Sequence, residues 1–116
     1  MEFMVNGLKW QLFNVPDHDE SLFVGGRECL GATYYKKLEV AMNSTLPKEL
    51  YRQVLIHELI HAFTFSYGVD LVANEETEES VCDFMGAHLD EIVKTVNHLM
   101  GLYPGRGIST NGSRIQ

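Results

Sequence analysis

The sequence predicts a single α+β domain in which a small antiparallel or mixed β-sheet packs on two main helices. Three observations support this fold class. Short runs of strand-forming residues separated by turn signals occupy the chain up to about Asn43, and two long segments with helical spacing of apolar residues follow. A chain of 116 residues with 45% hydrophobic content can also bury one core without cross-links. We therefore expect one domain over residues 1–102 and a loose, Gly- and Ser-containing tail over residues 103–116.

The N-terminal part of the chain is predicted to be β structure. Asn6-Gly7, the strongest short hairpin signal, stands between apolar residues and precedes the strand-forming run 8–15. Residues 16–26 contain a cluster of polar residues and a Gly-Gly pair, which are typical of a loop. Residues 29–35 and 37–42 are two further strand candidates. In the last of these, apolar side chains alternate with their neighbours, as in a half-buried strand.

A first helix is expected to begin near Ser44 and Thr45, which offer capping hydroxyls, with Pro47 in its first turn. It should end near Tyr67, where Gly68 can adopt the left-handed terminating conformation. Between residues 54 and 65 this segment is apolar nearly all round, a pattern typical of a central, buried helix.

A second helix is expected from Asn74, a good cap, to about Met100. Apolar residues recur along it at three- and four-residue spacing and predict one buried stripe, formed by Val81, Phe84, Met85, His88, Leu89, Ile92, Val93, Val96 and Leu99.

The first helix carries the H-E-x-x-H pattern, His57-Glu58-Leu59-Ile60-His61. Residues four apart lie on the same helix face, so both imidazoles can bind one zinc ion. Glu58 lies beside them and is predicted to be the catalytic base that takes a proton from the attacking water. Burial of three polar groups in an apolar helix costs a few kcal/mol unless each is paired, and a metal would pair all three.

A catalytic zinc usually has three protein ligands, so a third is expected from the acidic start of the second helix. Glu79, eighteen positions after His61, is the preferred third ligand, with Glu75 and Glu78 as alternatives. Asp83, one turn after Glu79, is predicted to support a ligand histidine through a hydrogen bond.

Together, His57-Glu58-x-x-His61 and the later Glu79 and Asp83 resemble the gluzincin arrangement of thermolysin-type peptidases. The short domain, with strands leading into the motif helix, is similar to the minimal zincins of phages and mobile elements, including ImmA/IrrE-type and SprT-like proteins. The resemblance covers roughly residues 31–100 and implies peptide-bond hydrolysis. It also implies that the strand at about Lys37–Asn43 is the sheet edge along which an extended peptide or protein substrate pairs.

The sequence departs from these families in three respects. It has no clear counterpart of the Tyr or His that stabilises the oxyanion in thermolysin-like enzymes, although Tyr34, Tyr35 and Tyr67 are candidates. It also has neither a DNA-binding helix-turn-helix region nor a C-terminal zinc ribbon.

Charge and hydropathy argue against two classes of partner. A formal net charge of -7 would repel a phosphate backbone, and the Lys and Arg residues are scattered. No stretch approaches the roughly eighteen consecutive apolar residues of a membrane span, and the start lacks the pattern of a secretory signal. We expect a cytoplasmic protein that binds neither nucleic acid nor membrane.

The leading hypothesis is thus a zinc metallopeptidase. The alternatives are a non-catalytic zinc-binding module that kept the zincin fold, and a metal-free helical interaction protein.

Overall fold

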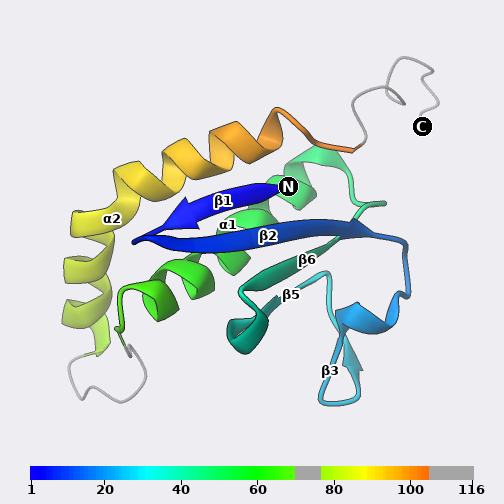
Figure 1. Ribbon diagram of the computed structural model, residues 1–116, viewed down its shortest axis with the longest axis horizontal. Helices are drawn as coiled ribbons and strands as arrows, with labels where there is room; N and C mark the ends of the chain where they lie inside the picture. Colours follow the sequence, from blue (N-terminus) through cyan, green and yellow to red (C-terminus); the bar gives the residue numbers. More distant parts are fainter. Residues whose placement is uncertain (70–76, 105–116) are drawn as a thin grey trace.

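The computed structural model describes residues 1–69 and 77–104 and has two layers, a β-sheet and a pair of helices (Figure 1). The four-stranded sheet has the order β1-β2-β6-β5, and β3 and β4 form a separate small hairpin. The α+β class with a mixed sheet and two helices is therefore confirmed. The elements are β1 (Glu2–Val5), β2 (Leu8–Val15), the 3-10 turn η1 (Glu20–Leu22), β3 (Phe23–Val24), β4 (Arg27–Glu28), β5 (Gly31–Tyr34), the 3-10 turn η2 (Tyr35–Lys37), β6 (Glu39–Asn43), α1 (Lys48–Ser66) and α2 (Thr77–Met100).

The predicted first hairpin is confirmed and is joined to the end of α1. Asn6 and Gly7 form its turn with φ of 48° and 82°, the positive values that a type I′ turn requires. The Asn6 side chain donates to the carbonyl of Ser66 at 3.0 Å, and the indole of Trp10 donates to the Ser66 hydroxyl at 2.9 Å. These bonds position the C-terminal end of α1 against the hairpin.

Strand β6 lies inside the sheet, so the prediction that Lys37–Asn43 forms the sheet edge is wrong. It pairs in parallel with β2, from Gln11 opposite Glu39 to Val15 opposite Asn43, and antiparallel with β5 on its other side. The edge strands are β1 and β5, and β5, at the lower side of the sheet in Figure 1, is the one next to β6. A parallel pair between segments far apart in sequence leaves no local signal, so the sequence could not show that β6 had neighbours on both sides.

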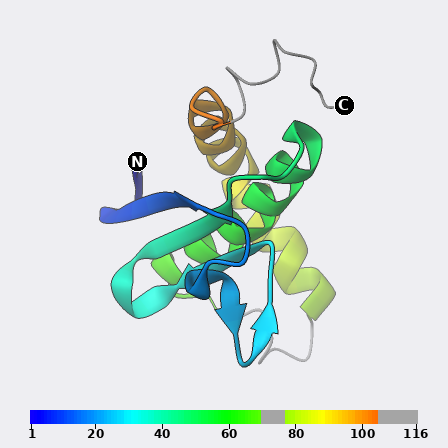
Figure 2. The same cartoon turned by 90° about the vertical axis from the view of Figure 1, so that its right-hand side faces the viewer.

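Both helices lie on one side of the sheet, as the view in Figure 2 shows. The core fills the space between them and the sheet face that Val40 and Met42 share. Its members are Phe3, Val5, Trp10, Leu12, Val40, Met42, Leu46, Tyr51, Leu55, Leu59, Ala62, Phe63, Phe84, Ile92, Val96 and Leu99.

Helix α1 is buried on one side only, which corrects the expectation of a helix surrounded by protein. Leu55, Leu59 and Phe63 are inaccessible to solvent, whereas Phe65 is 46% exposed. The helix begins after Pro47, which occupies the N-cap position and has no side-chain oxygen to accept a hydrogen bond, and the Thr45 hydroxyl donates to the Asn43 side chain. Its end agrees with the prediction, since Gly68 has φ of 70°.

The buried stripe of α2 is narrower than predicted. Phe84, Ile92, Val96 and Leu99 are buried, whereas Val81, Leu89 and Val93 are exposed. The predicted cap at Asn74 lies outside the described residues.

The predicted tail does not begin at Tyr103. This ring packs edge-on against Tyr51, with centroids 5.0 Å apart, and its hydroxyl donates to the carbonyl of Leu46. Residues 105–116 lie outside the described part of the chain.

Candidate metal centre

His57 and His61 project together from the open face of α1. Their ring centroids are 5.0 Å apart, as expected for residues separated by one helical turn, and both residues are exposed. The His57 side chain is 69% accessible. The imidazoles can therefore reach a metal from solvent. Their exposure also removes the argument that burial would force these two groups to find a partner, because water can satisfy them.

Glu58 is the buried polar group of the motif, at 6% exposure. The Thr33 hydroxyl, on the edge strand β5, donates to its Oε1 at 2.7 Å, and Glu58 Oε2 lies 4.0 Å from Nε2 of His57. A carboxylate buried at this depth needs a hydrogen-bond donor, and Thr33 supplies one. The Glu58 carboxylate is thus held between the sheet edge and the imidazole pair.

Tyr35 is the tyrosine that reaches the site. Its hydroxyl lies 3.2 Å from Nδ1 of His61, which leaves Nε2 as the nitrogen available to a metal. Burial and, secondarily, the negative charge of Glu58 raise the pKa of the Tyr35 phenol, so the phenol stays protonated at neutral pH. The other two candidates are engaged elsewhere: Tyr34 donates to the carbonyl of Ser21, and Tyr67 donates to Glu91.

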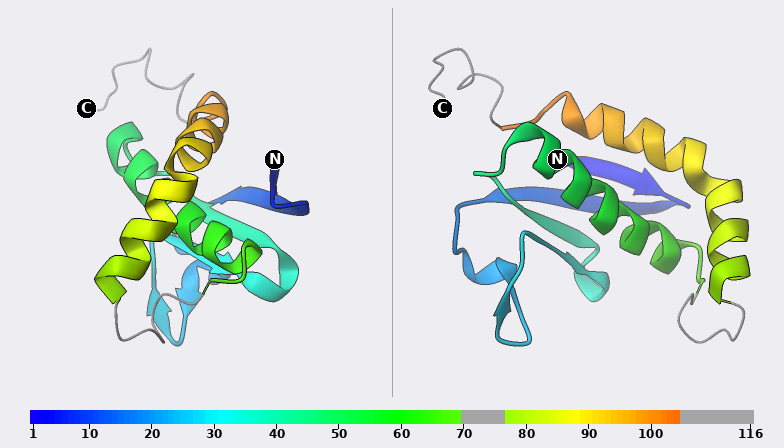
Figure 3. Two further views of the ribbon diagram at one scale, coloured as in Figure 1. Left: turned by 90° about the vertical axis from the view of Figure 1, so that its left-hand side faces the viewer. Right: turned by 180° about the vertical axis from the view of Figure 1, so that it is seen from behind.

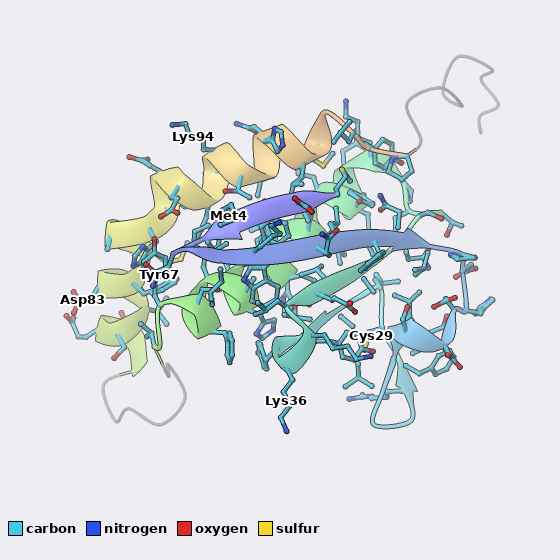
Figure 4. All side chains as sticks on the ribbon, in the orientation of Figure 1. Met4, Cys29, Lys36, Tyr67, Asp83 and Lys94 are labelled. Atoms are coloured by element: carbon cyan, nitrogen blue, oxygen red, sulfur yellow. The ribbon has the colours of Figure 1, made fainter. Side chains whose placement is uncertain are left out.

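The structure does not bring the carboxylates of α2 to the imidazole pair. Glu78, Glu79 and Asp83 are exposed, and the first turns of α2 lie beyond the C-terminal end of α1 (Figure 3). Asp83 points away from the molecule (Figure 4). Among residues 1–69 and 77–104, no group of three possible ligands within 4.8 Å of one another includes both imidazoles. The alternative ligand Glu75 lies outside the described residues.

One cluster of possible metal ligands that sequence reasoning missed lies at the opposite end of the sheet, where Asp17, His18 and Glu28 are within 4.8 Å of one another. Both ring nitrogens of His18 already face carboxylates, Nδ1 at 2.8 Å from Glu28 and Nε2 at 3.3 Å from Asp17. All three residues are exposed. This geometry is that of an imidazole bridging two carboxylates on the surface. No signal in the sequence pairs residues 17–18 with residue 28.

His88 is a packing residue, as predicted. It is half-buried between the rings of Tyr67, at 4.0 Å between centroids, and Phe84, at 4.7 Å. This contact joins the end of α1 to the middle of α2.

A hollow on the other face of the sheet is separate from the imidazole pair. It is lined by Phe13, Val15, Asp19, Glu20, Ser21, Tyr34, Lys37, Glu39 and Ala41. Phe13 and Ala41 face away from α1, because their neighbours Leu12 and Val40 face the core.

Comparisons with protein-family models, curated proteins and solved structures gave no match. Within the described part of the chain, no helix is long and apolar enough to cross a membrane. The geometry of the site is therefore the basis for inferring what the protein does.

Proposed function

We propose that this protein is a zinc-dependent peptidase with a zincin-like fold, in which His57 and His61 bind the metal and Glu58 is the general base. One observation carries the proposal: two imidazoles one turn apart lie beside a buried carboxylate, next to the edge strand of a sheet. Hydrolysis of an extended peptide needs three parts: an exposed pair of imidazoles that can bind a metal, a fixed proton acceptor and the edge of a sheet.

The donor atoms fit zinc. Imidazole nitrogens and a carboxylate oxygen are its usual ligands in catalytic sites, and His57 and His61 supply two of them. When bound, zinc lowers the pKa of a water toward about 7 and polarises a carbonyl oxygen. Glu79 is the proposed third ligand and Asp83 the supporting carboxylate. Both assignments require the first turns of α2 to lie nearer to the imidazoles than they do in this structure.

The proton transfers fall to Glu58. Its carboxylate accepts the proton of the attacking water and returns it to the amine that leaves. The Thr33 hydroxyl restrains one carboxylate oxygen, so the other is held on the side of His57. The Tyr35 hydroxyl lies at Nδ1 of His61, on the side of the ring away from the nitrogen left for the metal, so we assign it the role of orienting this imidazole rather than of stabilising the oxyanion.

The substrate is proposed to be a peptide or protein segment in extended conformation that adds to β5. This replaces the strand expected from the sequence, because β5 and not β6 has an open edge.

The proposal is tested by zinc content and peptide cleavage of the wild type, Glu58→Gln and His61→Ala. We expect stoichiometric zinc and cleavage in the wild type. Glu58→Gln should keep zinc but lose activity by about a thousandfold or more, because the base is not a ligand. His61→Ala should lose both. Full activity of Glu58→Gln, or a wild type that neither carries nor binds zinc at neutral pH, would show that the proposal is wrong.

A non-catalytic zinc-binding module is the second candidate. It is favoured by the positions of Glu79 and Asp83, which are not at the imidazole pair. Spectroscopy of the bound metal separates the two: four protein ligands indicate a structural site, whereas three ligands and an exchangeable position indicate an enzyme.

A further inference from the structure

A row of contacts joins β5 and the following Tyr35 to α1, and it gives the site a direction. A Cβ at Gly31 would lie 2.9 Å from Val54, the Thr33 hydroxyl bonds Glu58 at 2.7 Å, and the Tyr35 hydroxyl lies 3.2 Å from His61. The strand and the helix therefore run in the same direction along the site. Gly31 and Val54 mark one end, and Tyr35 marks the other.

The backbone of β5 is open to a further strand. The carbonyl of Leu30 accepts a hydrogen bond from the backbone N–H of Asn43. In an antiparallel ladder, hydrogen-bonded and non-hydrogen-bonded residue pairs alternate, so this bond determines which pairs of β5 and β6 are of each kind. Gly31 and Thr33 then belong to the pairs whose backbone groups point away from β6. Within the described residues they make no backbone hydrogen bond to another element.

Two aromatic rings lie at the Tyr35 end of the site. Tyr35 stacks on Phe65, with centroids 5.0 Å apart and planes at 16°, and Phe65 follows His61 by one helical turn. The exposed fractions of Tyr35 and Phe65 are 41% and 46%. Both rings are nevertheless held in place, because the Tyr35 hydroxyl contacts His61 and the Phe65 ring packs edge-on against the buried Trp10, with centroids 6.2 Å apart. A large apolar surface is thus held rigidly next to the imidazole pair.

We propose that the Tyr35–Phe65 pair is a specificity subsite that selects substrates with an aromatic or large aliphatic side chain on the N-terminal side of the bond to be cleaved. The inference rests on the proposed peptidase function. An added strand pairs more stably in the antiparallel orientation, and it then runs from Tyr35 toward Gly31. Its N-terminal residues, within two positions of the cleaved bond, face the two rings.

The first measurement is capture of peptides, which does not depend on turnover. Immobilised Glu58→Gln is incubated with a pool of random dodecapeptides, and the bound peptides are sequenced by mass spectrometry. We expect enrichment of Phe, Tyr, Leu and Met. For one captured peptide, replacement of its enriched residue by Ala should weaken binding about tenfold, which corresponds to the burial of one such side chain.

The variants that identify the subsite are Phe65→Ser and Phe65→Leu, each made in the Glu58→Gln protein. Phe65→Ser should lose the enrichment, and Phe65→Leu should keep it because an apolar surface remains. Phe23→Ser is the matched control, since Phe23 is 43% exposed but lies in the β3–β4 hairpin. Melting temperatures establish that each variant is folded.

The second measurement is cleavage of the same pool by the zinc-loaded wild type. Enriched residues one or two positions before the cut support the proposal. Capture without apolar enrichment, enrichment that survives Phe65→Ser, or enrichment only after the cut overturns it. If the captured peptides show the enrichment but are never cut, the subsite stands as a peptide-binding surface and the peptidase function fails.

Discussion

Glu58, the proposed general base, is held in place by its surroundings. It is 6% exposed, and the Thr33 hydroxyl donates to it at 2.7 Å. A hydrogen bond to a charged group contributes about 1.5–3 kcal/mol, more than an ordinary one. The orientation of this carboxylate therefore depends on a residue twenty-five positions earlier in the chain.

Thr33→Val should lower kcat by about tenfold or more, because Glu58 loses the bond that orients it. Zinc content should not change, since neither residue is a proposed ligand. Thr33→Ser keeps the hydroxyl and should restore most of the activity. Steady-state kinetics with metal analysis tests this, and equal kcat values for the Val and Ser variants would contradict it.

Gly31 is packed too tightly to carry a side chain. A Cβ there would lie 2.9 Å from Val54, 3.1 Å from Glu58 and 3.2 Å from Met42. Gly31→Ala should lower the free energy of unfolding by about 1–3 kcal/mol, the usual effect of overpacking. Urea unfolding of the variant measures it.

Gly86→Ala is the matched control for Gly31→Ala. Gly86 lies within α2, and a Cβ there meets no atom within 4 Å. The change should be neutral or stabilise the protein by up to about 1 kcal/mol, because Ala favours a helix interior. Similar losses in both variants would show that the packing around Gly31 is not the cause.

At the scale of elements, α1 divides its functions between two faces. Leu55, Leu59 and Phe63 bury one face against the sheet, and the other face presents His57 and His61 to solvent. Ser66 at its end accepts the indole N–H of the buried Trp10, so the hairpin holds the helix in register with the sheet. Helix α2 packs against α1 through the buried residues Phe84, Ile92, Val96 and Leu99, and His88 adds a ring contact with Tyr67.

The assignment of Glu79 can be decided by comparing it with its neighbour. Glu79→Ala should weaken zinc binding by more than about a hundredfold, since even the loss of a supporting group costs ten- to a hundredfold. Glu78→Ala should change it less than about threefold. Competition with a fluorescent chelator at neutral pH measures both affinities. The reverse order would make Glu78 the ligand, and no effect of either would favour a different third ligand.

At the scale of the molecule, one buried core spans the sheet and both helices, and Tyr51 is among its largest fully buried side chains. Its hydroxyl donates to Asn14 on β2, and Tyr103 packs against its ring. Burial raises the pKa of Tyr51 to about 12. The folded state therefore holds this proton at a pH where the unfolded chain, with a pKa near 10, has lost it.

Stability should consequently fall as the pH rises from about 10 to 12. In this window the folded state binds more protons than the unfolded state, so the free energy of unfolding decreases by up to about 1.4 kcal/mol per pH unit. Below about pH 9, Tyr51 should make no contribution to the pH dependence of the free energy of unfolding. Urea unfolding at several pH values, with Tyr51→Phe as the control, measures the slope. A variant as sensitive as the wild type would contradict the assignment.

The local elements were largely predictable because their signals are local. Asn6-Gly7 specified a turn, the end of α1 at Gly68 followed from its tolerance of positive φ, and the spacing of His57 and His61 put them on one face. The prediction that α1 is buried on all sides was wrong. Apolar residues such as Phe65 stay exposed because the helix is covered on one side only.

The sequence by itself determined the α+β class, the two helices and the imidazole pair with Glu58 beside it, since periodicity and turn chemistry act within a few residues. Only the tertiary structure decided that β6 is central and β5 is the open edge, that Thr33 and Tyr35 reach Glu58 and His61, and that Glu79 and Asp83 lie apart from the pair. These relations depend on parallel strand pairing and on the path of the chain between helices, which bring together residues that no local pattern connects.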